Sequence, residues 1–179
     1  MTERAGVYGG SLYDLAAEEN LTEPILKDMF EVRQLFRDNQ DYLRLLAEPS
    51  IKKDERIAMI DKAFGTACER YLVNFLKLLC ERGMLGEYEG CCESYRKRYN
   101  ADHNIAEAVV TSAVALSDAQ LTSLSSRLES ISGKHIELTQ KLDPKVLAGI
   151  KVELEGRQLD GTLSGRLDSM SRKLGEKIV

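Results

Sequence analysis

Few of the residues that perform enzyme chemistry stand at the spacings that a metal or catalytic site requires. His103 and His135 are the only histidines, and neither has a second metal-binding residue at a fixed spacing. Cys91 and Cys92 are adjacent on a predicted helix, so their thiols point in different directions, and the four cysteines form no C-x-x-C motif. We therefore predict ordinary surface histidines, reduced thiols, no metal site and no catalytic residues.

One glycine-rich stretch and one basic run have the composition of phosphate-binding segments. Residues 161–166 (GTLSGR) lack a lysine after a glycine and the spacing of a Walker loop, so a turn at Asp160-Gly161 is the better interpretation. The run Arg96-Lys97-Arg98 is flanked by Glu93 and Asp102, which favours a solvated helix face. We expect no cofactor and no small-molecule substrate.

The composition is typical of a folded protein without affinity for nucleic acid. The chain has 179 residues, of which 43% are hydrophobic and 30% charged, and its formal net charge is -4. Nucleic-acid binders usually carry a basic surplus, which is absent here. No apolar stretch approaches the roughly twenty residues of a membrane span, and the opening MTERAGVYGG resembles no signal peptide. We expect a protein that sits in the cytoplasm or on the cytoplasmic face of a larger structure.

Two shifts in composition divide the chain. All Phe and Tyr residues fall within the first 99 positions, and the remaining positions contain none. Residues 1–104 hold 19 acids and 15 bases, whereas 105–179 hold 10 of each. We therefore predict two domains, 1–104 and 105–179.

The first domain has the periodicity of a six-helix bundle. Apolar residues recur at helical spacing over 3–19, and further helices are predicted from Thr22, over Tyr42 to Leu46, from a Ser50 cap, from about Cys68 to Arg82-Gly83, and from Gly86 to Tyr99. Short links between such helices are typical of a compact bundle.

The second domain mixes strands and helices. Residues 106–113 (AEAVVTSA) are rich in strand formers, and Ser117 to Gln120 form a capping box that begins a helix ending at Gly133. Strands are predicted at Ile136 to Leu138 and at Ile150 to Leu154, followed by a turn toward Leu159. One apolar stripe predicts a terminal helix; it comprises Leu163, Leu167, Met170, Leu174 and Ile178. The fold class is therefore mostly α, a six-helix bundle followed by a small α+β domain.

Two helices of the first domain carry unusual apolar surface. The first has Tyr8, Leu12, Leu15 and Ala16, and the fifth is apolar almost all round. Such a helix is either central to the bundle or covered by a partner, and the pattern leaves both open. Gly9-Gly10 within the first helix indicates close approach of another backbone, or simple sequence drift.

Motifs distributed over the chain resemble those of the delta subunit family of F-type ATP synthase, the oligomycin-sensitivity-conferring protein family. In the first domain these are residues 8–16 (YGGSLYDLA), 46–51 (LAEPSI) and 74–83 (NFLKLLCERG). In the second they are 110–117 (VTSAVALS), 143–152 (DPKVLAGIKV) and 160–167 (DGTLSGRL). Small residues replace the family's usual alanines at 9–11, and Ala148 stands where a glycine is usual.

The resemblance implies a non-catalytic stator subunit that links the alpha/beta catalytic head to the peripheral-stalk b subunits and resists rotor torque. It implies that the N-terminal helix of an alpha subunit binds a groove between the first and fifth helices. The implied groove residues are Tyr8, Leu12, Tyr13, Asn74, Phe75 and Leu78. The C-terminus of b would bind the second domain, through Gly149, Ile150, Val152, Asp160, Gly161, Arg166 and Leu167.

The resemblance also implies a location. The subunit would be peripheral, on the cytoplasmic face of the bacterial cell membrane, as part of the synthase. The alternatives left open are a helical adaptor unrelated to ATP synthase and an enzyme with a cryptic site.

Overall fold

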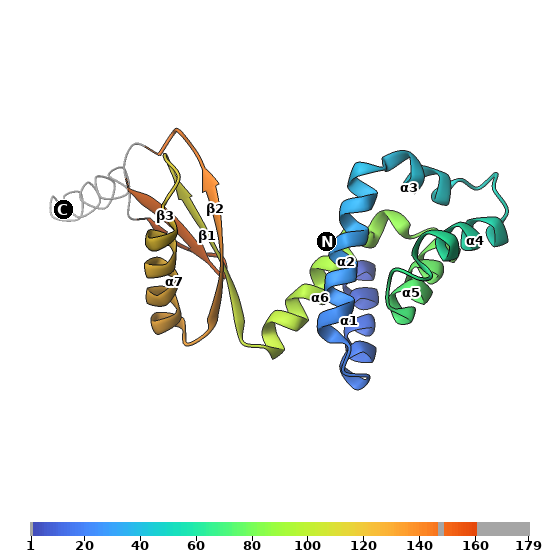
Figure 1. The fold of residues 1–179 in the computed structure, drawn as a ribbon, viewed down its shortest axis with the longest axis horizontal. Helices are drawn as coiled ribbons and strands as arrows, with labels where there is room; N and C mark the ends of the chain where they lie inside the picture. Colours follow the sequence, from blue (N-terminus) through green and yellow to red (C-terminus); the bar gives the residue numbers. More distant parts are fainter. Residues whose placement is uncertain (1, 147–148, 161–179) are drawn as a thin grey trace, which may run out of the picture. The chain divides into compact units, whose positions relative to one another are not determined.

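The computed structural model describes residues 2–146 and 149–160 (Figure 1). The chain forms two compact units, Met1–Tyr99 and Asn100–Val179. The division falls within helix α6 (Tyr88–Asp102), directly after the last aromatic residue, Tyr99. Each unit has its own hydrophobic core.

The first unit is helical throughout. Its elements are α1 (Glu3–Glu18), α2 (Thr22–Asp38), α3 (Gln40–Ala47), α4 (Lys53–Phe64), α5 (Arg70–Glu81), a 3-10 turn η1 (Leu85–Glu87) and the first part of α6. All six α-helices contribute to one buried cluster, which includes Leu12, Ile25, Leu46, Ile60, Leu72 and Tyr95. The prediction of a mostly helical protein with a small sheet is confirmed.

Several helix ends differ from the predictions. Ser50 does not cap α4, because that helix begins at Lys53 and its N-cap position is Lys52, which makes no side-chain cap bond. The Ser50 N–H donates to the Glu48 carboxylate (3.3 Å) in the preceding turn. At α1, the hydroxyl of Thr2 accepts a bond from the Ala5 N–H (3.3 Å), a cap that the sequence analysis missed. Gly83 adopts φ +66° directly after α5, which is the predicted glycine stop.

Two buried tyrosines tie α6 to α2. The Tyr88 hydroxyl donates to the Met29 carbonyl (3.1 Å), and the Tyr95 hydroxyl donates to the Thr22 carbonyl (2.9 Å). Burial raises the pKa of both phenols, so both remain donors at neutral pH. Both bonds satisfy polar atoms that would otherwise be buried without a partner.

Over residues 100–146 and 149–160, the second unit is a four-stranded sheet with one helix. Its elements are β1 (Ile105–Ser112), α7 (Asp118–Ser132), β2 (His135–Leu142), β3 (Ile150–Leu154) and β4 (Arg157–Asp160), and the strand order is β2-β1-β3-β4. Strands β1 and β2 are parallel, whereas β1–β3 and β3–β4 are antiparallel. The crossover helix α7 covers one face of the sheet (Figure 1).

Local sequence signals explain the ends of these elements. The predicted capping box is present, with the Ser117 hydroxyl accepting from the Gln120 N–H, and Gly133 ends α7 at φ +70°. Glu155 and Gly156 both have positive φ, as a two-residue hairpin turn requires, and they connect β3 to a strand, β4, where we predicted only a turn. The predicted terminal helix lies outside the described residues.

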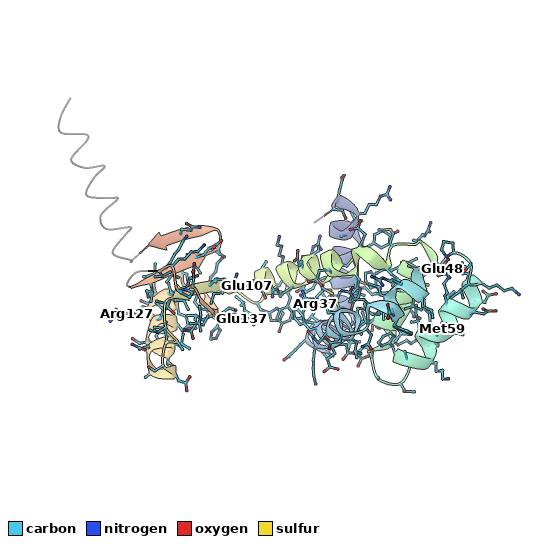
Figure 2. The ribbon with its side chains drawn as sticks, turned by 90° about the horizontal axis from the view of Figure 1, so that it is seen from above. Arg37, Glu48, Met59, Glu107, Arg127 and Glu137 are labelled. Atoms are coloured by element: carbon cyan, nitrogen blue, oxygen red, sulfur yellow. The ribbon has the colours of Figure 1, made fainter. Side chains whose placement is uncertain are left out.

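The two faces of the sheet differ in polarity. Ala108, Val110 and Val152 face α7 and form a small core with Leu128. Glu107 and Glu137 are paired in register on adjacent strands, at positions that alternate with the core-facing ones (Figure 2). Ile131, near the C-terminal end of α7, is 76% exposed.

Candidate partner-binding site

A groove runs between α1 and α5. Its volume is about 400 Å³, and it is open to solvent along its length. Eight residues line it: Tyr8, Ser11, Leu12, Leu15, Tyr71, Asn74, Phe75 and Leu78. On each helix these positions are three or four residues apart, the spacing that places side chains on one helix face.

The apolar residues of the groove divide into a floor and a rim. Leu12 is 4% exposed and Phe75 is 7% exposed, because both also pack into the core. Leu15 and Leu78 are each 38% exposed and so present apolar surface to solvent. Exposed leucines facing each other across a groove are typical of helix-binding sites, where a partner covers them.

Polar side chains stand among these leucines. Tyr71 forms a hydrogen bond to Glu19, which follows the end of α1, and this bond raises the pKa of the Tyr71 phenol. Asn74 is exposed in the middle of the α5 side and can both donate and accept hydrogen bonds. A groove with an apolar floor and a few polar groups can fix the position of a bound helix.

The structure brings five of the six predicted groove residues together: Tyr8, Leu12, Asn74, Phe75 and Leu78. Tyr13 does not line the groove. Its ring packs edge-on against Tyr95 of α6, with 5.2 Å between ring centroids, and it is 4% exposed. Tyr13 is therefore a core residue, because its position on α1 is turned toward α6 rather than α5.

Three further residues line the groove that were not predicted as groove residues: Ser11, Leu15 and Tyr71. Leu15 was noted only as apolar surface of the first helix. Helical spacing could have identified all three. Ser11 and Leu15 follow Tyr8 by three and seven residues, and Tyr71 precedes Phe75 by four, so helical spacing alone places them on the same faces.

The position of α1 depends on close contact with α6. A Cβ atom added at Gly9 would lie 2.3 Å from the carbonyl oxygen of Cys91, so only glycine allows this backbone approach. Ser94 of α6 donates to the Gly6 carbonyl (3.0 Å), and Arg98 pairs with Asp14. Of the two interpretations of Gly9, close backbone approach is confirmed.

The predicted b-binding residues of the second unit are described only in part. Gly149 precedes β3 with φ +92°, Ile150 is half-buried, Val152 is buried in the core, and Asp160 is the last residue of β4. Gly161, Arg166 and Leu167 lie outside the described residues. Ile150 also lines a hollow of about 410 Å³ beside α7, together with Leu116, Leu124 and Arg127.

Among the described residues, no group of three or more His, Cys, Asp or Glu side chains could hold a metal ion. Burial raises the pKa of Cys91 to about 11 and that of Cys92 to about 12, and burial beside Asp28 raises the pKa of Cys68 to about 11. These thiols are protonated at neutral pH and are poor nucleophiles. Within the same residues, the helices are too short or too polar for a membrane-spanning segment.

Comparisons with known proteins identify a family. Residues 5–174 match the profile of the family described as "ATP synthase delta (OSCP) subunit". The chain is 31% identical to ATP synthase subunit delta of Agrobacterium fabrum (strain C58), with 94% of this chain and 90% of the relative covered. Subunit delta of Clostridioides difficile (strain 630) is 27% identical, and 97% of each chain is covered.

A solved structure has the same fold. It is a chain in the cryo-EM structure of the Toxoplasma gondii mitochondrial ATP synthase hexamer, with a TM-score of 0.70, 17% identity, and coverage of 97% of this chain and 98% of that one. The alternative of a helical adaptor unrelated to ATP synthase is therefore wrong. The chain belongs to the ATP synthase delta (OSCP) subunit family, a family of structural rather than catalytic subunits.

Proposed function

We propose that this subunit holds the catalytic head of an ATP synthase to its peripheral stalk, with the α1/α5 groove binding the N-terminal helix of an alpha subunit. The observation that carries the proposal is the groove itself, with its apolar floor and the exposed rim leucines Leu15 and Leu78. Helices α1 to α6 act in this role as one bundle. Family membership supports the assignment to ATP synthase.

The physical task is to stay bound under load. Rotation of the rotor exerts torque on the head, so a stator subunit must dissociate slowly. An amphipathic helix that covers Leu15 and Leu78 and contacts Phe75 would gain affinity from buried apolar area centred on an aromatic residue. Tyr71 and Asn74 would set its register through hydrogen bonds.

The second unit would bind the C-terminal end of a b subunit. Of the predicted residues, Ile150 is half-buried and lines the hollow beside α7, whereas Val152 supports it from the core. Gly149 and Asp160 flank this region at the ends of β3 and β4, and Gly161, Arg166 and Leu167 complete the proposed set. In this arrangement the subunit is peripheral, on the cytoplasmic face of the bacterial cell membrane.

A titration tests the groove. The probe is a synthetic peptide of about 20 residues from the N-terminus of the alpha subunit of the same organism, with one tryptophan added, because this protein has no tryptophan. We expect saturable, blue-shifted emission. Leu78→Asp should weaken binding by 2 kcal/mol or more, roughly the size of a hot-spot loss.

The matched control is Leu35→Asp, since Leu35 is an exposed leucine on α2 that does not line the groove. Equal binding by folded Leu78→Asp and Leu35→Asp variants would refute the groove assignment. Phe75→Asp should also abolish binding, but Phe75 is buried, so its folding must be measured first.

A separate titration tests the second unit. With a C-terminal b-subunit peptide as probe, Ile150→Asp should weaken binding about tenfold, a loss of about 1.4 kcal/mol. Ile131→Asp, at an exposed isoleucine of α7 that does not line the hollow, should leave binding unchanged. Undiminished binding by Ile150→Asp would remove this hollow from the b-binding surface.

A further inference from the structure

A second hollow of the helical unit lies away from the α1/α5 groove and shares no residue with it. Its volume is about 320 Å³, and it is formed by α2, α3, η1 and the start of α6. The residues that define its chemistry are Arg33, Arg37, Arg44, Phe36, Leu85 and Tyr88. No motif in the sequence predicts a binding role for any of these positions.

The charge of this hollow is opposite to that of the whole chain. Three arginines line it and Glu89 is the one acid among its lining residues, whereas the chain as a whole carries -4. One oxygen of Glu89 serves two guanidinium groups, at 2.7 Å from Arg37 Nη2 and 3.4 Å from Arg33 Nη1. Each guanidinium has five N–H donors, so one carboxylate leaves most of them available.

The arginines stand beside a rigid apolar floor. The Arg33 guanidinium lies over the ring of Phe30, 4.7 Å from its centroid, which fixes its orientation. Phe36 and Tyr88 pack edge to face, with 5.3 Å between their centroids, and both are buried. Arg37, in contrast, has a side chain that is 54% exposed, and Arg44 forms a surface pair with Asp41 (3.3 Å).

We propose that this hollow is a docking site for an acidic amphipathic segment of a partner protein, one that presents a carboxylate next to an apolar side chain. The carboxylate would pair with Arg37 and Arg44, in the planar two-point geometry that guanidinium groups favour. The apolar neighbour would cover the floor at Leu85 and Phe36. A free inorganic anion would leave that floor exposed, so charge and shape together favour a peptide.

The test uses two synthetic amphipathic peptides of about 16 residues with the same leucine pattern, one with glutamate and the other with lysine at the polar positions. Binding of each to the full chain is measured by fluorescence anisotropy at low salt. We expect the glutamate peptide to bind more tightly, although the protein is acidic overall. Arg37→Gln should weaken that binding roughly tenfold.

Two control variants show whether the peptide binds at this hollow. Lys27→Gln removes the same charge from the same helix at an exposed position outside the hollow, so a loss confined to Arg37→Gln locates the site. Leu78→Asp should leave the glutamate peptide bound, which separates this site from the α1/α5 groove and from the proposed function. Both variants are first checked for unchanged unfolding midpoints.

Three outcomes would overturn the proposal. The first is equal or tighter binding of the lysine peptide. The second is the same affinity for Arg37→Gln and Lys27→Gln. The third is displacement of the glutamate peptide by millimolar inorganic phosphate, which would make the hollow a simple anion site.

Discussion

The two units of this chain differ in how deeply they bury apolar residues. In the first, six helices surround a core with large side chains at its centre, such as Met29, Leu76 and Tyr95. In the described part of the second, a helix lies on one face of a sheet, and the fully buried positions are mainly small residues such as Ala108 and Val110. A core of large side chains contributes more to stability, so we expect local signals such as the capping box to matter relatively more in the second unit.

The units also differ in their content of aromatic residues and cysteines. Every Tyr, Phe and Cys residue of the chain falls within its first 99 positions. Tyrosine fluorescence therefore reports the first unit alone, whereas far-UV circular dichroism reports both.

The largest expected effect is a loss of stability of the first unit at alkaline pH. Burial raises the pKa of the Cys91 and Cys92 thiols above the ordinary value of 9.0, to about 11 and about 12. Below pH 9 both thiols are protonated in the folded and the unfolded chain, so they do not make the free energy of unfolding depend on pH. Between pH 9 and 11 only the unfolded chain ionises, so each thiol lowers the free energy of unfolding by about 1.4 kcal/mol per pH unit.

Urea unfolding at pH 7, 9 and 10.5 measures this loss of stability. Circular dichroism follows the whole chain, and valine methyl NMR signals follow the second unit. The first unit should lose stability and the second should change much less. Cys92→Ala should reduce the slope. A first unit equally stable at pH 7 and pH 10.5 would contradict the proposed cause.

Core truncation should separate the units. Leu76 of α5 is fully buried. Leu76→Ala should destabilise the first unit by about 3 kcal/mol, because it removes buried apolar atoms and leaves a cavity in the core. Val152→Ala should destabilise the second unit by about 2 kcal/mol. Tyrosine fluorescence should detect the first change and not the second; detection of both would mean that the units unfold together.

Contact between α1 and α6 should be sensitive to a single methyl group. Gly9→Ala should destabilise the first unit by about 2 kcal/mol, because its Cβ would meet the Cys91 carbonyl. Gly6→Ala on the same helix has no atom within 4 Å of the added Cβ and should stabilise by about 0.5–1 kcal/mol through helix propensity. Urea midpoints read by tyrosine fluorescence check both; equal effects of the two substitutions would refute the steric explanation.

The sequence predicted most of the fold because helical periodicity and capping residues act locally. Five of the residues that the resemblance selected line the groove. Tyr13 lies in the core instead, because an apolar helix face is wide enough to hold both groove and core residues, and only the position of α6 decides between them. The arginine-lined hollow could not be predicted, since Arg33, Arg44 and Glu89 come from three helices and each is typical of a solvated surface.

The smallest expected effect tests the local signals of the second unit. Ser117→Ala removes the hydroxyl that accepts the Gln120 N–H, and should lower the stability of that unit by about 1 kcal/mol. Ser130→Ala, at an exposed position within α7, should instead be neutral or slightly stabilising, because alanine is the better helix former. Circular dichroism is the measurement, since the unit has no aromatic probe. If Ser117→Ala left the stability of the unit unchanged, as expected for Ser130→Ala, the cap would not determine where α7 begins. Packing of α7 against the sheet would then determine it.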